Sequence, residues 1–299
     1  MPPVTTTDAS AAPSGIPLLH RLVDDASVFP PGNASLADAV RGHAVHRSAW
    51  YAGCVGPLLV PAASVADLVQ VLDAPDAVAS PTAHQPLEVV LIARPGAAPG
   101  TTTAALDALS GEHRVRVVGA ELAWQEGWRD LGLGDLALAL EVPRGDDSAV
   151  AVADVHTARG EGRRVVAKFR TGPTPTWPWP DEAELGGFIG LCAQLGVPFK
   201  LTGGLHHAVR GRYAVDGIPE ENHGVLDVLV ATSAALAGAS AQELAALLAV
   251  RDVTALADLV AAWPDATALA VREAFTAYGC CTVTDPLAEL ADLGLLHRP

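Results

Sequence analysis

The sequence contains very little lysine. Of its 19 lysine and arginine residues only Lys168 and Lys200 are lysines, so 17 are arginine. Arginine stays protonated in proteins, whereas a lysine whose pKa is lowered can lose its proton and act as an amine nucleophile. A chain that uses arginine as its general cation and keeps lysine at two places is expected to need the amine there.

Several motifs of common enzyme classes are also missing. There is no GxGxxG or Walker-type loop, which argues against an open sheet that binds a dinucleotide or a nucleoside triphosphate. There is no HExxH motif and no CxxC pair, and the four cysteines, Cys54, Cys192, Cys280 and Cys281, lack the spacing of a disulfide framework. We therefore expect no cofactor, no metal and a reducing, cytoplasmic environment.

The charge and the apolar runs narrow the range of partners. A net charge of −15 disfavours nucleic acid and anionic membranes, since both would repel the protein. The most apolar stretch, 225–250, contains Asp227, Gln242 and Glu243 and is too polar to span a bilayer. Residues 1–15 lack the basic start and apolar run of a signal peptide, and we expect them to form a disordered tail. The expected partner is a small-molecule substrate, and a homo-oligomer is possible.

Short apolar runs alternate with helical patterns rich in alanine and leucine, which is typical of repeated βα units around a parallel sheet. Eight runs, followed in most cases by a helix, predict an α/β fold of the (β/α)₈ TIM-barrel type over residues 16–250 with a C-terminal helical extension over 251–299. The predicted strands are 19–23, 56–60, 87–92, 114–120, 136–142, 164–169, 198–201 and 224–230. The predicted helices are 35–49, 65–72, 102–109, 148–159, 181–195 and 241–248, with Ser35, Ser64, Asp181 and Ser240 as N-caps.

The two lysines occupy similar positions at the ends of consecutive predicted strands. Lys168 lies in VVAKFRTG and Lys200 in VPFKLTGG, one βα unit later. Because the carboxyl ends of barrel strands line the active site, both amines are expected to project from strands six and seven into one cavity. The alternative is that each amine is a strand-end charge that reaches solvent.

These motifs resemble those of the class I, Schiff-base aldolases of the deoxyribose-phosphate aldolase type. KFRTG, residues 168–172, is similar to the strand-six motif of that family, and KLTGG, residues 200–204, to its strand-seven motif. The resemblance implies that Lys168 forms the imine and that Lys200 lowers its pKa. It also implies an aspartate near the end of strand one, where Asp24 and Asp25 stand, and a phosphate site after strand eight, where Thr232 and Ser233 stand. The loops after strands six and seven depart from the family, so the substrate is not carried over.

Other residues are expected around the two lysines. By alternation Arg170 faces the same cavity as Lys168 and is suited to hold an anionic substituent. The remaining expected substrate-binding residues are Thr171, Thr202, Gly203, Gly204, His206 and His207, with at most one of the two histidines entering the site. Asp24 or Glu141 is expected to move protons, with Asp25 and Glu121 as alternatives.

The sequence thus predicts an enzyme, a metal-independent lyase or aldolase acting on a small oxygenated, anionic carbonyl compound. Two alternatives stay open. One is a metal-dependent lyase or hydrolase that uses Glu121, Glu141, His223 and His206 or His207 as ligands, with the lysines as electrostatic stabilisers. The other is a non-catalytic barrel that binds a small anionic metabolite.

Overall fold

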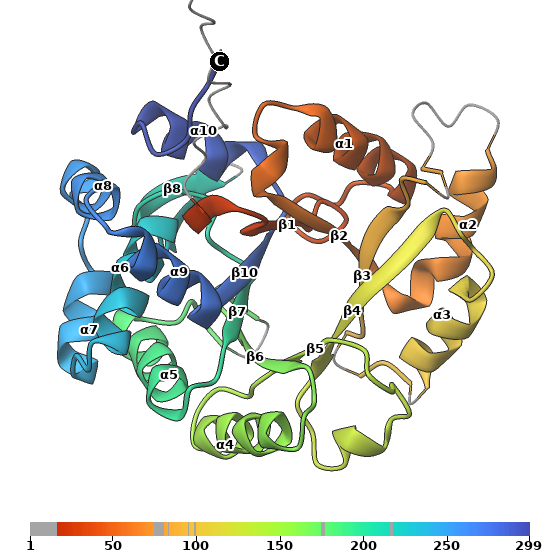
Figure 1. The fold of residues 1–299 in the computed structure, drawn as a ribbon, viewed down its shortest axis with the longest axis horizontal. Helices are drawn as coiled ribbons and strands as arrows, with labels where there is room; N and C mark the ends of the chain where they lie inside the picture. Colours follow the sequence, from red (N-terminus) through yellow and green to blue (C-terminus); the bar gives the residue numbers. More distant parts are fainter. Residues whose placement is uncertain are drawn as a thin grey trace, which may run out of the picture.

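Eight parallel strands close into a barrel in the computed structural model (Figure 1). The structure describes residues 17–74, 81–82, 84–94, 96–98, 100–174, 177–215 and 218–299, so the predicted tail over 1–15 lies outside the described residues. The strand order around the barrel is β1-β10-β7-β6-β5-β4-β3-β2. These strands are β1 (Val23–Asp25), β2 (Val55–Pro61), β3 (Leu87–Ile92), β4 (Val115–Ala123), β5 (Leu138–Glu141), β6 (Val165–Arg170), β7 (Phe199–Thr202) and β10 (Phe275–Cys280).

Helices cover the outside of the barrel (Figure 1). They are α1 (Leu36–Ser48), α2 (Val65–Asp73), α3 (Thr101–Leu109), α4 (Asp147–Gly160), α5 (Glu182–Leu195), α6 (Val225–Leu236), α7 (Ala241–Leu248), α8 (Val253–Ala261), α9 (Asp265–Ala274) and α10 (Thr284–Asp292). Short 3₁₀ helices lie at Pro17–Leu19, Ala52–Cys54, Ala62–Ser64 and Trp128–Asp130. The TIM-barrel fold with C-terminal helices is confirmed.

The N-caps explain where several helices begin. The side chains of Ser35, Asp181 and Ser240 accept hydrogen bonds from backbone amides of the first turns of α1, α5 and α7, as predicted. The prediction for Ser64 is wrong, because its side chain makes no capping bond. Ser64 ends the 3₁₀ turn Ala62–Ser64, which leads directly into α2.

The prediction of strand eight is wrong. Residues 225–236 form helix α6, and the barrel is closed instead by β10, which pairs in parallel with β1 and β7. The apolar run from Val225 to Val230 is buried on all sides, and a buried helix and a buried strand give the same pattern. The closing strand therefore lies inside 251–299, the segment predicted as a helical extension.

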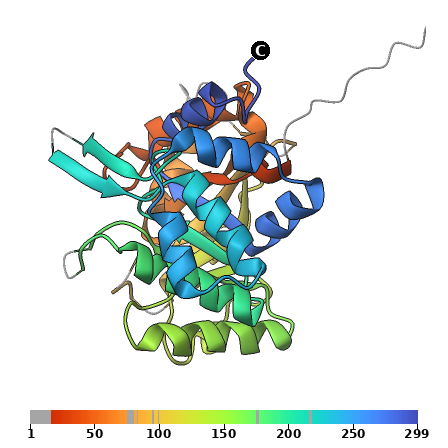
Figure 2. The same ribbon diagram turned by 90° about the vertical axis from the view of Figure 1, so that its left-hand side faces the viewer.

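The first strand also begins later than predicted. Residues 17–19 form a 3₁₀ helix, and β1 covers Val23–Asp25 rather than 19–23. Between β7 and α6 an antiparallel hairpin, β8 (Gly211–Val215) and β9 (Ile218–Asn222), projects away from the barrel (Figure 2).

Aromatic packing outside the barrel fixes which way the lysines point. Phe169 of β6 stacks on Phe188 of α5, and Phe199 of β7 stacks on Phe275 of β10. Adjacent side chains of a strand point to opposite faces. Since Phe169 and Phe199 pack outwards against this cluster, Lys168 and Lys200 point into the barrel lumen.

Candidate active site inside the barrel

Lys168 and Lys200 lie side by side in the lumen, directly paired in the register of β6 and β7. Their residues are only 4% and 6% exposed, so neither is a strand-end charge that reaches solvent. A buried ammonium is costly unless it is paired with opposite charge and hydrogen-bonded. The lumen must therefore supply carboxylates.

Glu121 of β4 is the carboxylate that both lysines share. Its Oε2 lies 2.7 Å from Lys168 Nζ, and its Oε1 forms an ion pair with Lys200 Nζ. Burial by itself would raise the pKa of Glu121, but the two ammonium groups lower it to about 2. Glu121 is therefore ionised at neutral pH and holds the two lysines together.

Asp24 of β1 completes the surroundings of Lys200. Its Oδ2 accepts a hydrogen bond of 2.5 Å from Lys200 Nζ. Burial raises the pKa of Asp24, and the positive charge of Lys200 only partly opposes this effect. Asp24 is thus the carboxyl of the cluster that most readily holds a proton. Asp24 thus lies beside Lys200, whereas Asp25 points away and pairs with His43 of α1 at 3.1 Å.

Glu141 of β5 and Arg170 of β6 form the more accessible side of the cluster. Glu141 Oε2 lies 2.8 Å from Lys168 Nζ, and Glu141 Oε1 lies 3.3 Å from Arg170 Nε. The side chains of Glu141 and Arg170 are 19% and 35% exposed, against 1% for Glu121. Arg170 ends β6, so this side faces the carboxyl end of the barrel. We call Asp24, Glu121, Glu141, Lys168 and Lys200 the lumen cluster.

The charges of the lumen cluster differ from the sequence prediction in one respect. Burial would lower the pKa of Lys168, but the ion pairs with Glu121 and Glu141 overcome burial and raise it. For Lys200, the ion pairs with Asp24 and Glu121 likewise outweigh the effect of burial and raise its pKa. Both lysines therefore rest as ammonium groups, and Lys200 does not leave Lys168 unprotonated. In the sequence, Asp24, Glu121 and Glu141 stood only as candidate proton carriers or metal ligands, and their negative charges were not set against the effect of the neighbouring lysine.

The threonines and glycines of the two motifs pack against each other. Thr171 donates its backbone N–H to the carbonyl of Thr202 at 2.7 Å, and its hydroxyl donates to the same carbonyl at 3.1 Å. A Cβ on Gly172 would lie 1.7 Å from the carbonyl oxygen of Gly203, and one on Gly204 would lie 2.7 Å from the Thr171 hydroxyl. The two loops thus cross in close contact, which gives the matching Thr-Gly sequences a packing role that holds both lysine-bearing strands in register.

The two adjacent histidines after β7 diverge. His206 Nδ1 lies 3.1 Å from the Thr282 hydroxyl and 3.7 Å from the thiol of Cys281, beside the carboxyl end of β10. Burial lowers the pKa of His206, so its imidazole is neutral at pH 7. His207 instead pairs with Glu289 of α10 at 2.7 Å and stacks on Tyr213 of the hairpin. Of the two, only His206 stays beside the end of a barrel strand.

Three residues predicted for the site lie elsewhere. Thr232 and Ser233 are in helix α6, and the Thr232 hydroxyl donates to the carbonyl of Val228 one turn earlier, so no loop after a strand places them at the mouth. His223, an alternative metal ligand, contacts Arg210 and the carbonyl of Pro180. Among the described residues no three histidine, cysteine, aspartate or glutamate side chains are arranged to hold a metal ion.

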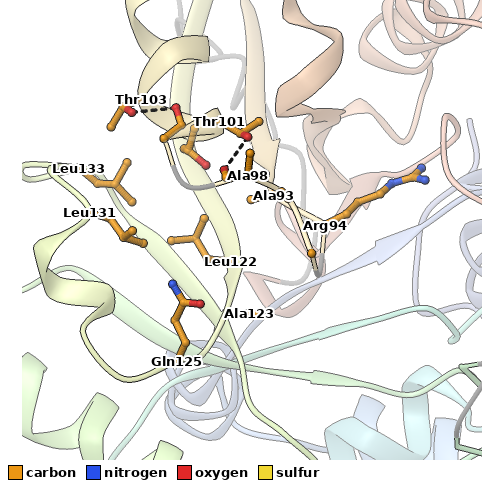
Figure 3. Close-up of a pocket in the computed structure, with 14 residues that line it drawn as sticks. Ala93, Arg94, Ala98, Thr101, Thr103, Leu122, Ala123, Gln125, Leu131 and Leu133 are labelled. Atoms are coloured by element: carbon orange, nitrogen blue, oxygen red, sulfur yellow. Dashed lines mark hydrogen bonds between the residues drawn. The ribbon is translucent and has the colours of Figure 1, made fainter.

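A small pocket of about 100 Å³ lies at the carboxyl edge, between the loops that follow β3 and β4 (Figure 3). Leu122 and Leu131 form part of its wall, and Thr101, at the start of α3, donates its hydroxyl to the carbonyl of Ala98 at 2.7 Å. Neither lysine lines this pocket, so it is distinct from the lumen cluster.

No family model, curated protein or solved structure matches the chain. Across the ranges that the structure describes, no helix is both long enough and apolar enough to cross a membrane. The site's own geometry therefore carries the functional argument.

Proposed function

We propose that this protein is an enzyme of the carbon–carbon lyase or aldolase type, in which Lys168 forms an imine with a small, anionic carbonyl compound. The observation that supports this most directly is the position of the Lys168 amine. It lies between two carboxylates, 2.7 Å from Glu121 and 2.8 Å from Glu141, at the accessible side of a buried cluster. A TIM barrel that places such groups at the carboxyl side of its strands is typical of enzymes.

The neighbouring carboxylates give the reaction its proton path. Lys168 must first pass a proton to Glu141, and its free amine then adds to the substrate carbonyl to form a C–N bond. Protonation of the resulting hydroxyl lets it leave as water and gives an iminium ion. A base then removes the proton of a hydroxyl on the β-carbon, and the bond between the α- and β-carbons breaks. The β fragment leaves as a carbonyl compound, and the electron pair of the broken bond enters the iminium to give an enamine, which is protonated and hydrolysed to regenerate the amine. Glu141 and Asp24 are the groups suited to move these protons.

The remaining cations suit an anionic substrate. Arg170 touches Glu141 and is 35% exposed on its side chain, so its guanidinium can reach a carboxylate or phosphate entering from the mouth. Lys200 stays charged between Asp24 and Glu121 and stabilises negative charge that develops on the substrate. Because Lys168 rests as an ammonium, imine formation should increase as the pH rises above neutrality.

Trapping with borohydride tests the proposal. The protein is incubated with a panel of small aldehydes, ketones and keto acids, reduced, digested and analysed by mass spectrometry. We expect a covalent adduct on Lys168 only, none in Lys168→Arg, and less in Lys200→Met. The chain has only two lysines, so assignment is direct. An adduct on Lys200 would reverse the two roles, and a substrate that turns over normally in Lys168→Arg would eliminate the imine.

The raised pKa values of both lysines favour a second candidate, a barrel that binds a small anion without turnover. Permanent cations are sufficient to bind an anion, whereas imine formation requires deprotonation. This candidate would be supported over the enzyme if an anionic carbonyl compound bound saturably but gave no reducible adduct from pH 6 to about 9. An unperturbed lysine is still mostly protonated over that range.

A further inference from the structure

A cavity of about 360 Å³ opens to solvent at the amino-terminal end of the barrel and extends towards the lumen cluster. Its lining includes Ala137 and Arg164, which directly precede β5 and β6, so it reaches the amino-terminal end of the barrel, opposite the proposed active site. Its inner end is formed by Lys200 and Glu121. The lumen cluster is thus approached from two ends.

The cavity exists because small residues stand where a barrel usually carries large ones. Layers of bulky branched side chains normally fill the interior of a TIM barrel. Here the residues that line the cavity include Gly119 on β4 and Ala139 on β5, with Ala137 just before β5. At Gly119 even a Cβ would lie 2.9 Å from the carbonyl oxygen of Ala137, so the strands approach too closely for a larger residue.

The lining combines apolar walls with two arginines. Val90, Val118 and Val166 line the interior, whereas Arg159 and Arg164 lie at the amino-terminal end. Arg159 donates to the carbonyl of Val165 at 2.9 Å. Arg164 is exposed and forms no ion pair with any residue of the described ranges, in a chain whose net charge is −15. An unpaired cation at the mouth of an apolar cavity suits an anion with an apolar body.

We propose that this cavity binds a small monocarboxylate with a short aliphatic or aromatic body. The carboxylate contacts Arg164, and the apolar body lies against Val118 and Val166. The volume is at the lower end of the usual range for small-molecule sites, which fits a compact acid rather than a nucleotide or a long-chain lipid. This site lies outside the proposed imine chemistry, and its occupancy does not depend on that proposal being correct.

Bound acid would also affect the lumen cluster. Its apolar end would exclude water from the underside of Lys200 and Glu121, and removing water strengthens electrostatic interactions between buried charges. A carboxylic acid bound in the cavity would therefore change the electrostatic interactions of Lys200 and Glu121. It would do so from the end of the barrel opposite to the one at which the substrate enters.

Titration with hexanoate, phenylacetate and hexanol tests the proposal. Binding is measured by ligand-observed NMR and calorimetry. We expect both acids to bind with a dissociation constant on the order of 1 mM, and hexanol at least about tenfold more weakly, because it lacks the charge. Arg164→Met should weaken hexanoate binding at least about tenfold. The matched control is Arg163→Met, since Arg163 packs over the Trp128 ring and does not line the cavity.

Two further variants keep the result decisive. Ala139→Val adds bulk inside the cavity, and we expect it to abolish binding of both acids while leaving Arg164 intact. Arg170→Met removes the cation at the carboxyl side and should leave binding unchanged. Equal binding by wild type and Arg164→Met, no binding by wild type, or loss of binding in Arg170→Met alone would each overturn the proposal. Because these readouts measure binding, they do not depend on the borohydride result.

Discussion

Glu121→Gln is the substitution that most directly tests the electrostatics of the lumen cluster. It keeps the size of the side chain and removes the one negative charge that contacts both ammonium groups. Lys168 would retain Glu141, and Lys200 would retain only Asp24, whose pKa is raised by burial. The cluster would then hold two buried cations against two carboxyl groups, of which Asp24 has a raised pKa, so we expect a large loss of stability.

Two arguments give a similar size for this loss. The pKa of Glu121 is lowered from 4.5 to about 2, and at 1.36 kcal/mol per tenfold change in the ionisation constant this difference corresponds to roughly 3 kcal/mol. Removing one partner from a buried ion pair generally costs about 3–5 kcal/mol, because the other charge stays buried without compensation. We therefore expect Glu121→Gln to lower the free energy of unfolding by roughly 3–5 kcal/mol at pH 7.

Urea unfolding followed by tryptophan fluorescence measures the change, with the exposed Glu126→Gln as control. Since the pKa of Glu121 is lower in the folded state, its contribution is present above pH 4.5 and is lost as the pH falls towards 2. The difference between wild type and Glu121→Gln should shrink over that range. Adding Lys200→Met should recover part of the loss, because it removes the cation left without its partner.

The reasoning would be refuted if Glu121→Gln cost no more than Glu126→Gln. It would equally be refuted if the effects of Glu121→Gln and Lys200→Met were additive, since residues in direct contact should show a coupling energy. In either case Glu121 would not be the charge that holds the two lysines together.

Two further predictions concern residues outside the lumen cluster. Gly172→Ala should destabilise the protein and abolish adduct formation at Lys168, because the added Cβ would overlap the Gly203 carbonyl oxygen. The control is Gly187→Ala on α5, where a Cβ meets nothing within 4 Å, and it should have little effect in the same assays. Asp227→Asn should flatten the pH dependence of stability. Burial raises the pKa of Asp227 from 3.8 to about 7. The free energy of unfolding of the wild type therefore falls as the pH rises from 4 to 7, by at most roughly 4 kcal/mol. Urea unfolding at several pH values measures this slope, and an unchanged slope in Asp227→Asn would contradict the assignment.

The sequence predicted the parts of the fold that repeat. Strands two to seven were found because each is an apolar run followed by a turn and, in most cases, an amphipathic helix, and that pattern is local. The closing strand was missed for a physical reason. Residues 275–280, FTAYGC, carry Thr276 and Gly279 and follow a helix directly, so they give no long apolar run. Whether an apolar segment becomes a buried helix or a strand depends on what surrounds it, and that information is not local.

The candidate site, like the fold, was predictable from local sequence only in part. The rarity of lysine and the matching settings of Lys168 and Lys200 were sufficient to predict that both amines lie close together inside the barrel. The bridging role of Glu121 was not predictable in this way, because it comes from β4, some 47 residues before Lys168, and only barrel closure brings the two together. The signal available was a single carboxylate in the otherwise uncharged segment VVGAELA, on the face that alternation assigns to the lumen.

The position of β10 has a consequence for how the chain is made. Chains emerge from the ribosome amino-terminus first, and β1 and β7 remain unpaired edges on either side of a gap until residues 275–280 have been synthesised. Exposed strand edges are prone to pair with other chains. Asp24 and Lys200 face each other across this gap, so their ion pair forms only once the barrel is closed. Folding of this protein is therefore expected to finish after translation, and chains released before residue 280 should aggregate or depend on chaperones.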